Sequence, residues 1–553
     1  MGKLKFTADF ETTTNENDCR VWATGICSID EKYQFYCGNS IDYFFEFANY
    51  HQNATFYFHN LKFDGEFILV YLFEHGYTHT TSKNLEPKQF NSLISDKGLF
   101  YSLTICVDYD NTITIYDSLK IIPFPVEDVA KTFGLPISKL EIDYKADRAL
   151  GYILSEKEKE YVKNDVEIMA RALNLLFKQG LNQMTQGSNA LHDYKKTIGS
   201  KNFRKYFPIP AYDYDIRQSY KGGFTYCDPR ATKEDVGAGI VLDVNSLYPS
   251  VMYYQPLPYG EGKFFEGEYK QDNLYNLYIQ MFTCSFELKP NHIPTIQLKN
   301  NLSFVPTEYL TSSNGEEITM ALTNVDLQLF KDHYILKNVV YHSGWKFKST
   351  VGLFKKYIDK WTKVKTESTL NGNKGMRTLA KLMLNALYGK FALNPNVCSK
   401  YPFYDDGRIK YKNGSPETRD PLYIPVGAFV TAWARFKTIS SAQKVYDRFL
   451  YADTDSLHLR GTELPKELEI DPVKLGAWKH ESTFEKARFI RQKTYLEVID
   501  GKLNITCAGM PSKCYSYVTW DNFKLGSSFA GKLQPAHVKG GIILKDIDFT
   551  IKA

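Results

Sequence analysis

Two aspartates one residue apart, Asp453 and Asp455, stand inside an apolar, strand-like stretch over residues 449–459. Carboxylates at this spacing repel each other unless a cation lies between them, so the pair predicts a divalent-metal site. A solvated turn is the alternative, because turns favour Asp. A calcium loop of the EF-hand kind is excluded, because it needs further oxygen ligands and a glycine just downstream, where this chain has Leu-His-Leu.

A third carboxylate, Asp243, favours the metal site over the turn. It closes an apolar run over residues 239–244, after which the chain turns into a predicted helix. A charge at the end of such a strand is costly unless something binds it. We therefore expect Asp243 to complete the site begun by the Asp453 and Asp455 pair.

A second set of acids lies in the first third of the chain. Asp9 and Glu11 end a predicted strand, and residues two apart in a strand point to the same face. Asp64 stands at a strand-to-helix turn, and Asp165 shares one face of a helix with Tyr161. Singly, each acid fits a surface or cap residue; together they suit hydrolysis of phosphodiesters by two metal ions about 3.5–4 Å apart. The expected elements are strands over 4–13 and 55–60 and a helix over 158–177.

Positive charge is concentrated in one window. The chain carries a net +5, yet residues 345–381 hold ten Lys or Arg against two acids, which leaves the rest at −3. A solvated helix face is one explanation, but so one-sided a block is typical of a surface that meets phosphates.

The window leads into a predicted helix over residues 375–388. Arg377, Lys381, Asn385 and Tyr388 fall on one stripe, an apolar stripe lies opposite, and Gly389 stands where a C-terminal cap belongs. An ordinary surface helix has the same pattern. The chain has no Walker A loop, so phosphates must be held by such side chains and by metal.

Size and composition exclude several classes of protein. A chain of 553 residues should hold three or four domains. Its nine cysteines form no C-x-x-C pair, which predicts reduced thiols rather than disulfides or zinc ligands. Its longest obvious apolar run covers only residues 67–73, so we expect no membrane contact.

The N-terminal acids stand in three motifs that resemble the proofreading 3'-5' exonuclease of family B DNA polymerases. The matching stretches are Asp9-Phe-Glu11, Asn60-Leu-Lys-Phe-Asp64 and Tyr161-Val-Lys-Asn-Asp165. The resemblance implies that Asp9, Glu11, Asp64 and Asp165 hold metal ions and that Tyr161 orients the attacking water. It also implies contacts to the single-stranded primer end from Thr12, His59, Asn60, Phe63, Ser118 and Leu119.

Asp243 opens the string Asp-Val-Asn-Ser-Leu-Tyr-Pro-Ser, which resembles motif A of the same polymerases, and Lys381 opens Lys-Leu-Met-Leu-Asn-Ala-Leu-Tyr-Gly, which resembles motif B. The resemblance implies that Asp243, the Val244 carbonyl and Asp455 hold two Mg²⁺ ions, with Mn²⁺ as a substitute. Asp453 becomes a nearby or state-dependent catalytic ligand.

The resemblance also assigns substrate contacts. Tyr248 packs under the incoming sugar and excludes a ribose 2'-hydroxyl, and the other nucleotide contacts are Lys365, Lys381, Asn385 and Tyr388. Lys493 and Tyr495 match a K-x-Y motif that grips the primer strand. Tyr220, Gly222 and Gly223 match a Y-x-G-G motif that contacts template DNA, although paired glycines alone also suit a plain hairpin turn.

The motifs follow one another along the chain in the same order as in protein-primed family B DNA polymerases of the Bacillus phage phi-29 type, which this chain therefore resembles. This implies an α/β and α+β multidomain fold, with a ribonuclease-H-like 3'-5' exonuclease domain and a right-hand polymerase carrying two insertions. The second insertion is expected to contain a projecting hairpin. The expected divisions are exonuclease 1–185, palm 186–258 and 421–525, priming-protein insertion 259–351, fingers 352–390, strand-displacement insertion 391–420 and thumb 526–553.

The implied partners are primer-template DNA, single-stranded DNA, dNTPs and a terminal priming protein, for a phage-encoded monomer in the host bacterial cytoplasm. Two rival functions are a stand-alone exonuclease and a non-catalytic nucleic-acid binder. A nuclease has no use for Tyr248, Lys381 and the Asp453 and Asp455 pair. A binder has no use for seven carboxylates at catalytic spacings.

Overall fold

The computed structural model describes residues 3–297 and 309–552. Part of the predicted priming-protein insertion, residues 298–308, therefore lies outside the described residues. Within the described residues no helix has the length and apolar character needed to cross a membrane. All nine cysteines are free thiols, as predicted.

The N-terminal unit is an eight-stranded sheet with strand order β3-β2-β1-β4-β8-β7-β6-β5. β1 pairs parallel with β4, and β4 with β8, so the carboxyl ends of these three central strands meet at one edge. The long helix α4 packs on β1 and β2, and a capping box formed by Ser155 and Glu158 fixes its start. The strands are β1 (Lys5–Thr12), β2 (Val21–Ser28), β3 (Phe35–Gly38), β4 (Thr55–Phe58), β5 (Thr78–His79), β6 (Gln89–Ile94), β7 (Phe100–Cys106) and β8 (Thr112–Asp117). The helices are α1 (Ile41–Tyr50), α2 (Leu61–Glu74), α3 (Val126–Phe133) and α4 (Glu156–Lys178), so the predicted strands and helix are confirmed.

A five-stranded antiparallel sheet forms the second unit, in the order β23-β10-β22-β21-β9. The predicted hairpin around Asp453 is β21 and β22, joined by a turn in which Thr454 has φ 60°. β10 lies between β22 and β23, and helices α8 and α12 pack beside the sheet. The bounds are β9 (Thr225–Cys227), β10 (Gly239–Val244), β21 (Phe449–Asp453), β22 (Ser456–Arg460), β23 (Trp478–Phe484), α8 (Leu247–Tyr254) and α12 (Ile424–Lys444).

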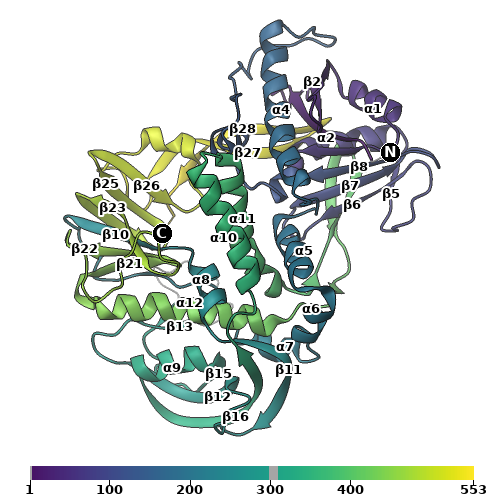
Figure 1. Ribbon diagram of the computed structural model, residues 1–553. Coiled ribbons are helices and arrows are strands. Elements are labelled where there is room, and N and C mark those ends of the chain that lie inside the picture. Colours follow the sequence, from purple (N-terminus) through teal and green to yellow (C-terminus); the bar gives the residue numbers. More distant parts are fainter. Residues whose placement is uncertain (1–2, 298–308, 553) are drawn as a thin grey trace.

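Helices α10 (Lys355–Leu370) and α11 (Lys374–Phe391) form a helical pair between the two sheets (Figure 1). α11 also contacts α3, α5 (Gln186–Ile198) and α12. The predicted end of this helix at Gly389 is wrong, because the helix continues to Phe391 and its C-cap is Ala392. Phe391 is 1% exposed, so core packing carries the helix past the glycine.

Two further units interrupt the polymerase-like part of the chain. The first is the four-stranded sheet β11-β16-β12-β15 with helix α9, at the bottom of Figure 1. The second contains the hairpin β18 and β19, whose turn residues Asp406 and Gly407 both have positive φ, as tight hairpin turns require. The predicted hairpin is therefore confirmed. The bounds are β11 (Leu257–Glu266), β12 (Leu277–Leu288), β15 (Ile318–Thr323), α9 (Asn324–His333), β16 (Tyr334–Thr350), β18 (Lys400–Asp405) and β19 (Arg408–Asn413).

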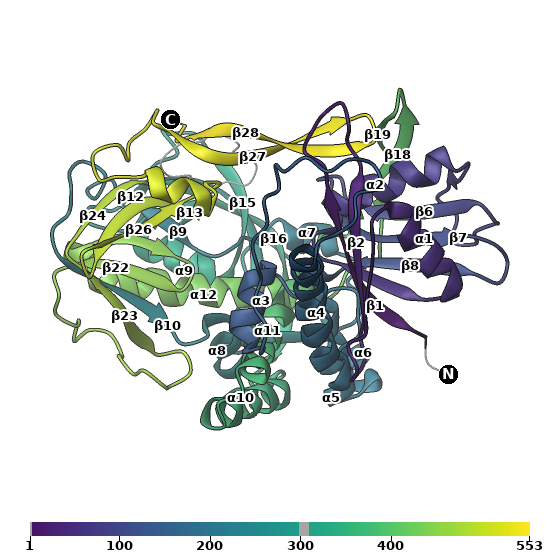
Figure 2. The ribbon, with the colours of Figure 1, turned by 90° about the horizontal axis from the view of Figure 1, so that it is seen from above.

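The C-terminal part has a three-stranded sheet, β24-β25-β26, and then the long hairpin β27 and β28. Figure 2 shows this hairpin reaching from the polymerase-like side across to α2 and to β18 and β19. At its tip Gly540 N donates to Gly407 O (3.1 Å), and Cys19 Sγ donates to Ile542 O (3.6 Å). The C-terminal hairpin thus contacts both the N-terminal unit and the hairpin of β18 and β19. The bounds are β24 (Lys486–Arg491), β25 (Thr494–Ile499), β26 (Lys502–Cys507), β27 (Ser528–Val538) and β28 (Gly541–Thr550).

Smaller elements connect these units. They are α6 (Ser200–Tyr206), α7 (Asp213–Arg217), β13 (Ile296–Gln297), β14 (Tyr309–Leu310), β17 (Asn396–Val397), β20 (Glu417–Thr418) and three 3-10 turns at Ser118–Lys120, Tyr446–Arg448 and Ser512–Tyr517.

Two candidate catalytic centres

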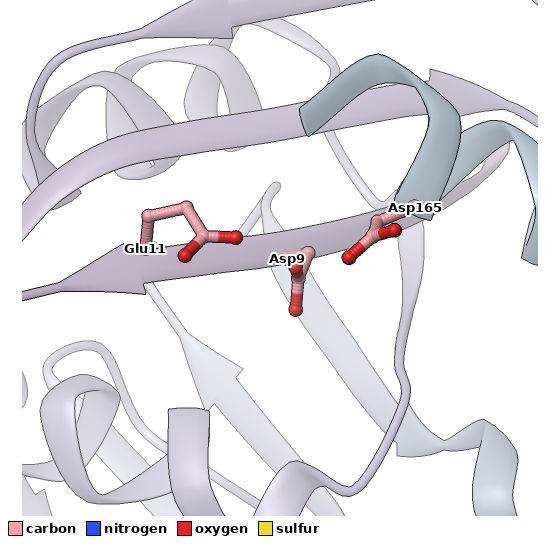
Figure 3. Close-up of side chains that lie close together, drawn as sticks. All are labelled: Asp9, Glu11 and Asp165. Carbon is pink, nitrogen blue, oxygen red and sulfur yellow. The ribbon is translucent and has the colours of Figure 1, made fainter. Parts of the chain in front are cut away.

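The first centre lies where β1 faces α4. Figure 3 shows Asp9 and Glu11 on β1 and Asp165 reaching toward them from α4. One carboxylate oxygen from each of the three lies within 4.8 Å of the others. Asp64, the fourth predicted ligand, is 4% exposed at the start of α2, and its Oδ1 accepts a hydrogen bond from Phe10 N (3.2 Å). The four acids, which the sequence placed on three separate elements, therefore lie close together.

Burial and mutual repulsion make these acids hold protons more tightly than usual. Burial raises the pKa of Asp9 to about 7, with a further contribution from the charge of Asp165. Burial, followed by the charge of Asp9, raises the pKa of both Glu11 and Asp64 well above the ordinary range. Asp165 Oδ1 is buried without a hydrogen-bond partner. The four carboxylates offer only oxygen donors, and a bound cation would relieve their mutual repulsion. Such a site fits a hard divalent cation such as Mg²⁺ or Mn²⁺.

Two residues that the sequence did not single out join this centre. Lys139 Nζ lies 2.8 Å from Asp165 Oδ2, and the charge of Asp165 raises the pKa of Lys139 although burial lowers it. The hydroxyl of Tyr144 lies 2.8 Å from that of Tyr161. Both come from the irregular segment 135–154, which has no periodicity from which their positions could be predicted.

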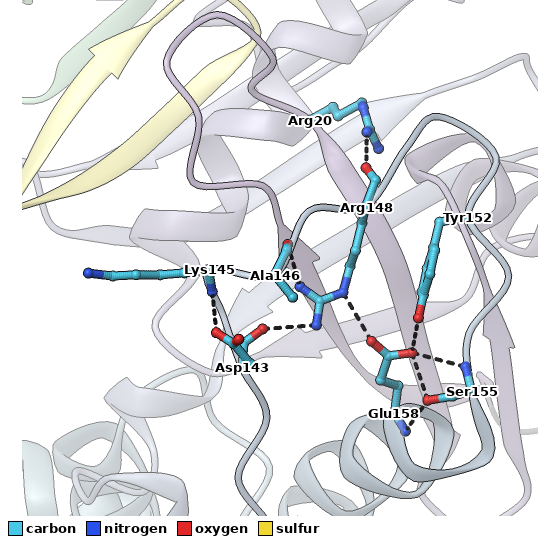
Figure 4. A network of polar contacts seen from close by, with 8 residues as sticks. All are labelled: Arg20, Asp143, Lys145, Ala146, Arg148, Tyr152, Ser155 and Glu158. Atoms are coloured by element: carbon cyan, nitrogen blue, oxygen red, sulfur yellow. Dashed lines mark hydrogen bonds and ion pairs between the residues drawn. The ribbon is translucent and has the colours of Figure 1, made fainter.

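A polar network fixes that segment against the start of α4 (Figure 4). The guanidinium of Arg148 donates to Glu158 Oε1 (3.0 Å) and to the carbonyls of Asp143 (3.0 Å) and Ala146 (3.1 Å). The Tyr152 hydroxyl donates to Glu158 Oε2 (2.8 Å). Arg148 and Glu158, at the centre of the network, are buried, and the network anchors the coil that carries Lys139 and Tyr144.

The predicted single-strand contacts surround this centre and remain predictions. Asn60 is exposed, and Thr12, Phe63 and Leu119 are half-buried. His59 uses both ring nitrogens internally: Nδ1 lies 3.0 Å from Ser118 Oγ and Nε2 lies 2.7 Å from Phe124 O. Ser118 is completely buried, so in this structure it supports His59.

The second centre lies at the end of β10. Val244 N donates to Asp455 O (2.7 Å), which places Asp455 beside the residue that follows Asp243. Burial, followed by the charge of Asp243, raises the pKa of Asp455 to about 6, and burial raises the pKa of Asp243. The two acids thus lie close together, Asp243 on β10 and Asp455 in the turn before β22. Their carboxylates are oxygen donors of the kind that a divalent cation prefers, and a metal site here stays a prediction. Val244 is the last residue of β10, and its carbonyl remains a predicted ligand.

Asp453 has different surroundings from Asp455. Its carboxylate accepts hydrogen bonds from Lys493 Nζ and from Thr225 Oγ1 (2.9 Å). Lys493 N in turn donates to the Tyr451 hydroxyl (3.0 Å). Lys493, predicted as a primer contact together with the half-buried Tyr495, therefore lies against the catalytic hairpin.

The predicted nucleotide and template residues meet above the hairpin. Tyr248 stacks on Tyr388 with ring centroids 3.9 Å apart and an angle of 22° between the rings. A Cβ on Gly223 would lie 2.7 Å from Thr454 Oγ1 and 3.1 Å from the Tyr248 hydroxyl, so only glycine fits at this approach. Arg435 NH1 donates to the carbonyl of Gly222 (2.7 Å), which holds the loop that also carries Tyr220.

The cationic stripe predicted on α11 is present. Arg377, Lys381 and Asn385 are exposed, while Leu379, Met383 and Leu387 on the other side are buried. Lys365, on α10, is half-buried. Burial lowers its pKa, as do the charges of Lys381, Arg377 and Lys479. Such a concentration of positive charge favours a bound polyanion.

The comparisons with known proteins agree over the whole chain. The sequence profile of the family described as "DNA polymerase type B, organellar and viral" matches residues 49–156 and 141–471. The chain is 47% identical over 579 residues to the DNA polymerase of Bacillus phage phi29, with 100% of each chain covered. It is 32% identical over 582 residues to the DNA polymerase of Streptococcus phage Cp-1, with 99% of this chain and 98% of the other covered.

Solved structures agree with the sequence relatives. The fold superposes on Phi29 DNA polymerase complexed with primer-template DNA with a TM-score of 0.94 at 46% identity, over 100% of each chain. For that polymerase with primer-template DNA and incoming nucleotide substrates the TM-score is 0.93, at the same identity and coverage. Since family profile, full-length identity and fold all coincide, the chain is a phi29-type phage member of the family B DNA polymerases, built as an exonuclease fold joined to palm, fingers and thumb.

Proposed function

We propose that this DNA polymerase also degrades DNA from the 3' end, and that it uses Mg²⁺ at both centres. The observation that carries the proposal is the presence of two separate acid clusters. Asp9 and Glu11 on β1 meet Asp165 on α4, and Asp243 on β10 lies beside the turn that carries Asp455. Incorporation and removal of nucleotides are different two-metal reactions, so a chain with both activities needs two such sites.

At the polymerase centre Asp243 and Asp455 hold the metal ions, with Val244 as a further oxygen donor. Bound there, divalent ions would supply the charge that lowers the pKa of the primer 3'-hydroxyl and stabilises the departing pyrophosphate. Lys365 and Lys381 bind the triphosphate of the incoming dNTP.

Around the reacting atoms, the stacked pair of Tyr248 and Tyr388 forms a platform under the sugar and base, with Asn385 beside it. The loop of Tyr220, Gly222 and Gly223 holds the template strand against the catalytic turn. Lys493 and Tyr495 hold the primer strand, and Asp453 positions Lys493.

At the exonuclease centre Asp9, Glu11, Asp64 and Asp165 would hold divalent ions, which would supply the charge that activates water. The Tyr161 hydroxyl, oriented by Tyr144, directs the attacking water, and Lys139 keeps Asp165 in place. The unpaired primer end lies against the residues predicted to contact single-stranded DNA, which are Thr12, His59, Asn60, Phe63, Ser118 and Leu119.

The wider role we propose is protein-primed, strand-displacing replication of a linear phage genome in the host bacterial cytoplasm by a monomer. We propose that a terminal protein binds to the inserted sheet of β11, β12, β15 and β16. The hairpin of β18 and β19 extends toward β27 and β28, which supports a role in separating the displaced strand. The divisions 1–185, 186–258, 259–351, 352–390, 391–420, 421–525 and 526–553 remain the proposed domains.

The decisive experiment separates the two centres. Replacing Asp453 and Asp455 by Ala should abolish nucleotide incorporation and leave 3' degradation intact, and replacing Asp9 and Asp64 by Ala should do the reverse. Loss of both activities in both variants, with folding intact, would contradict the assignment. For priming, failure to attach a nucleotide to a terminal protein's hydroxyl, while DNA primers are extended normally, would count against the proposed mode.

A further inference from the structure

We propose that Lys479 is a nucleotide-binding residue of the polymerase centre, which neutralises Asp243 in the metal-free enzyme and binds the triphosphate of the incoming dNTP when metal occupies that carboxylate. The inference rests on the proposed role of Asp243 as a metal ligand. Lys479 lies on β23 and belongs to none of the motifs identified in the sequence.

The register of the palm sheet puts Lys479 at the centre. β10 and β23 are antiparallel, and Asp243 is paired directly with Lys479. Residues paired in this way project from the same face with Cβ atoms about 4.5–5.5 Å apart. Lys479 Nζ lies 3.4 Å from Asp243 Oδ1. A cation therefore already lies beside the carboxylate to which a metal ion would bind.

A second acid on the same strand shares this ammonium. Lys479 Nζ lies 2.8 Å from Glu481 Oε2. Glu481 is the extra residue at the register shift between β10 and β23. A divalent ion on Asp243 would repel the ammonium, since like charges at this range interact strongly. The Lys479 side chain is 32% exposed on a flexible stem, so it can turn away from Asp243 while staying near Glu481.

The ammonium of Lys479 also acts on charged groups of the fingers helices. The charge of Lys479 contributes to the lowered pKa of Lys365, after burial and the charges of Lys381 and Arg377. The same ammonium acts on Asp455, whose pKa it lowers against burial. Lys479 is therefore close enough to act both on the acids proposed to hold metal and on the cations proposed to bind the triphosphate.

A purely structural ion pair does not account for this placement. Ion pairs as exposed as Lys479 with Asp243 contribute little to stability. An ammonium that binds phosphate makes a charge-assisted hydrogen bond of about 1.5–3 kcal/mol, and its loss weakens binding at least tenfold. The two roles therefore predict different measurements.

The test compares three variants. Lys479→Met keeps a similar side-chain length and removes the charge, and Lys479→Arg keeps the charge. Lys502→Met, on the exposed hairpin of β25 and β26, is the control. The first readout is equilibrium binding of dNTP to enzyme on a dideoxy-terminated primer-template with Ca²⁺, where no turnover occurs. We expect about tenfold weaker binding for Lys479→Met, near wild-type binding for Lys479→Arg and no change for Lys502→Met.

The second readout is binding of Mg²⁺ alone, followed as the metal-induced rise in melting temperature. Lys479→Met should bind Mg²⁺ more tightly, because the competing ammonium is gone.

The third readout is single-turnover incorporation by Lys479→Met. The dNTP concentration for half-maximal rate should rise about tenfold, with the maximal rate changed less than about threefold. Unchanged dNTP binding in Lys479→Met, or loss of binding that tracks a lower melting temperature, would overturn the inference.

One further variant separates this inference from the proposed function. Asp243→Asn should abolish incorporation. If Asp243→Asn stays active, the proposed polymerase centre fails. If Asp243→Asn is inactive but Lys479→Met binds dNTP as the wild type does, the role of Lys479 alone is refuted.

Discussion

The ammonium of Lys493 lies 2.6 Å from Oδ2 and 2.9 Å from Oδ1 of Asp453. Asp453 is thereby neutralised by a lysine, whereas Asp455, two residues later, faces Asp243 and has a raised pKa because of burial and that charge. The two aspartates of the catalytic hairpin therefore differ in role. Asp455 is placed to hold metal, and Asp453 is placed to orient Lys493.

This difference predicts unequal losses from conservative substitutions. Asp455→Asn removes a metal ligand and should lower the maximal rate of incorporation by about 10³-fold or more, since metal stabilises the transition state by several kcal/mol. Asp453→Asn perturbs a partner of Lys493 and should cost about 10–100-fold. Single-turnover incorporation on a saturating primer-template measures both. Equal losses would show that Asp453 is also an essential metal ligand.

The exonuclease centre should be more stable without one of its acids. Asp9 has a pKa of about 7 because of burial and the charge of Asp165, so its ionised form opposes folding. Asp9→Asn removes that charge and should raise the melting temperature of the metal-free protein at pH 8 by about 1 °C per kcal/mol relieved, while 3' degradation is lost. Asp96→Asn, at an exposed position, serves as the control. A lower melting temperature for Asp9→Asn alone would contradict the expected repulsion.

Metal binding at the polymerase centre should depend on pH. The pKa of Asp455 is about 6 in the metal-free protein, above the ordinary 3.8. Its protonation stabilises the metal-free fold; this contribution is complete below pH 3.8 and is lost as pH rises through about 6. Mg²⁺ must displace the proton, so its apparent affinity should fall up to about tenfold per pH unit below 6 and level off above 7. The metal-induced rise in melting temperature, measured from pH 5.5 to 8.5 in Asp9→Asn, reports this. Constant affinity across that range would refute it.

Tyr248 should determine the choice of sugar. Its ring stacks on Tyr388 and lies under the proposed sugar position. Tyr248→Val leaves room for a 2'-hydroxyl and should reduce discrimination against ribonucleotides by about 10–200-fold, the range that a few lost contacts allow. The ratio of kcat/KM for dNTP and rNTP measures this. An unchanged ratio would place the sugar elsewhere.

The contact of the exonuclease fold with the hairpins β18–β19 and β27–β28 should depend on the carboxylate of Glu66. Glu66, 2% exposed on α2, accepts a hydrogen bond from the Tyr411 hydroxyl of β19 (2.6 Å) and lies 3.5 Å from His537 Nδ1 of β27. Tyr411→Phe leaves a buried acceptor with one partner fewer, at a cost of about 1–3 kcal/mol. Faster proteolysis within residues 394–421 and a lower melting temperature are expected. Tyr109→Phe, at a ring that is 83% exposed, is the control, and equal behaviour of both variants would contradict the prediction.

Acids at the ends of apolar strands were predictable because strand periodicity is local. Asp9 and Glu11, two apart on one strand, had to share a face. Asp243 lies near the end of an apolar strand and Asp455 follows one, and a charge at such a position indicates a bound partner. Resemblance to a family then supplied the pairing between distant strands, which no local pattern contains.

The residues that were missed depend on long-range geometry. Lys139 and Tyr144 come from a coil positioned by the Arg148 and Glu158 network, and no periodicity in the sequence indicates that placement. Lys479 meets Asp243 only because of the register between β10 and β23, and that register shifts between Val241 and Leu242. A shift of one residue would turn such a side chain to the other face.

The bridge made by β27 and β28 also sets an order of events during synthesis. Lys545 Nζ lies 3.0 Å from Glu16 Oε2, and a Cβ on Gly541 would meet the ring of Phe67 on α2. At about 5–20 residues per second, the ribosome needs roughly half a minute to two minutes to make the 529 residues between the first pair. The N-terminal sheet must therefore fold and remain soluble with this face of α2 uncovered. A chain released before β27 and β28 are made would keep this face of α2 exposed. We therefore expect incomplete translation products to be the species most prone to aggregate.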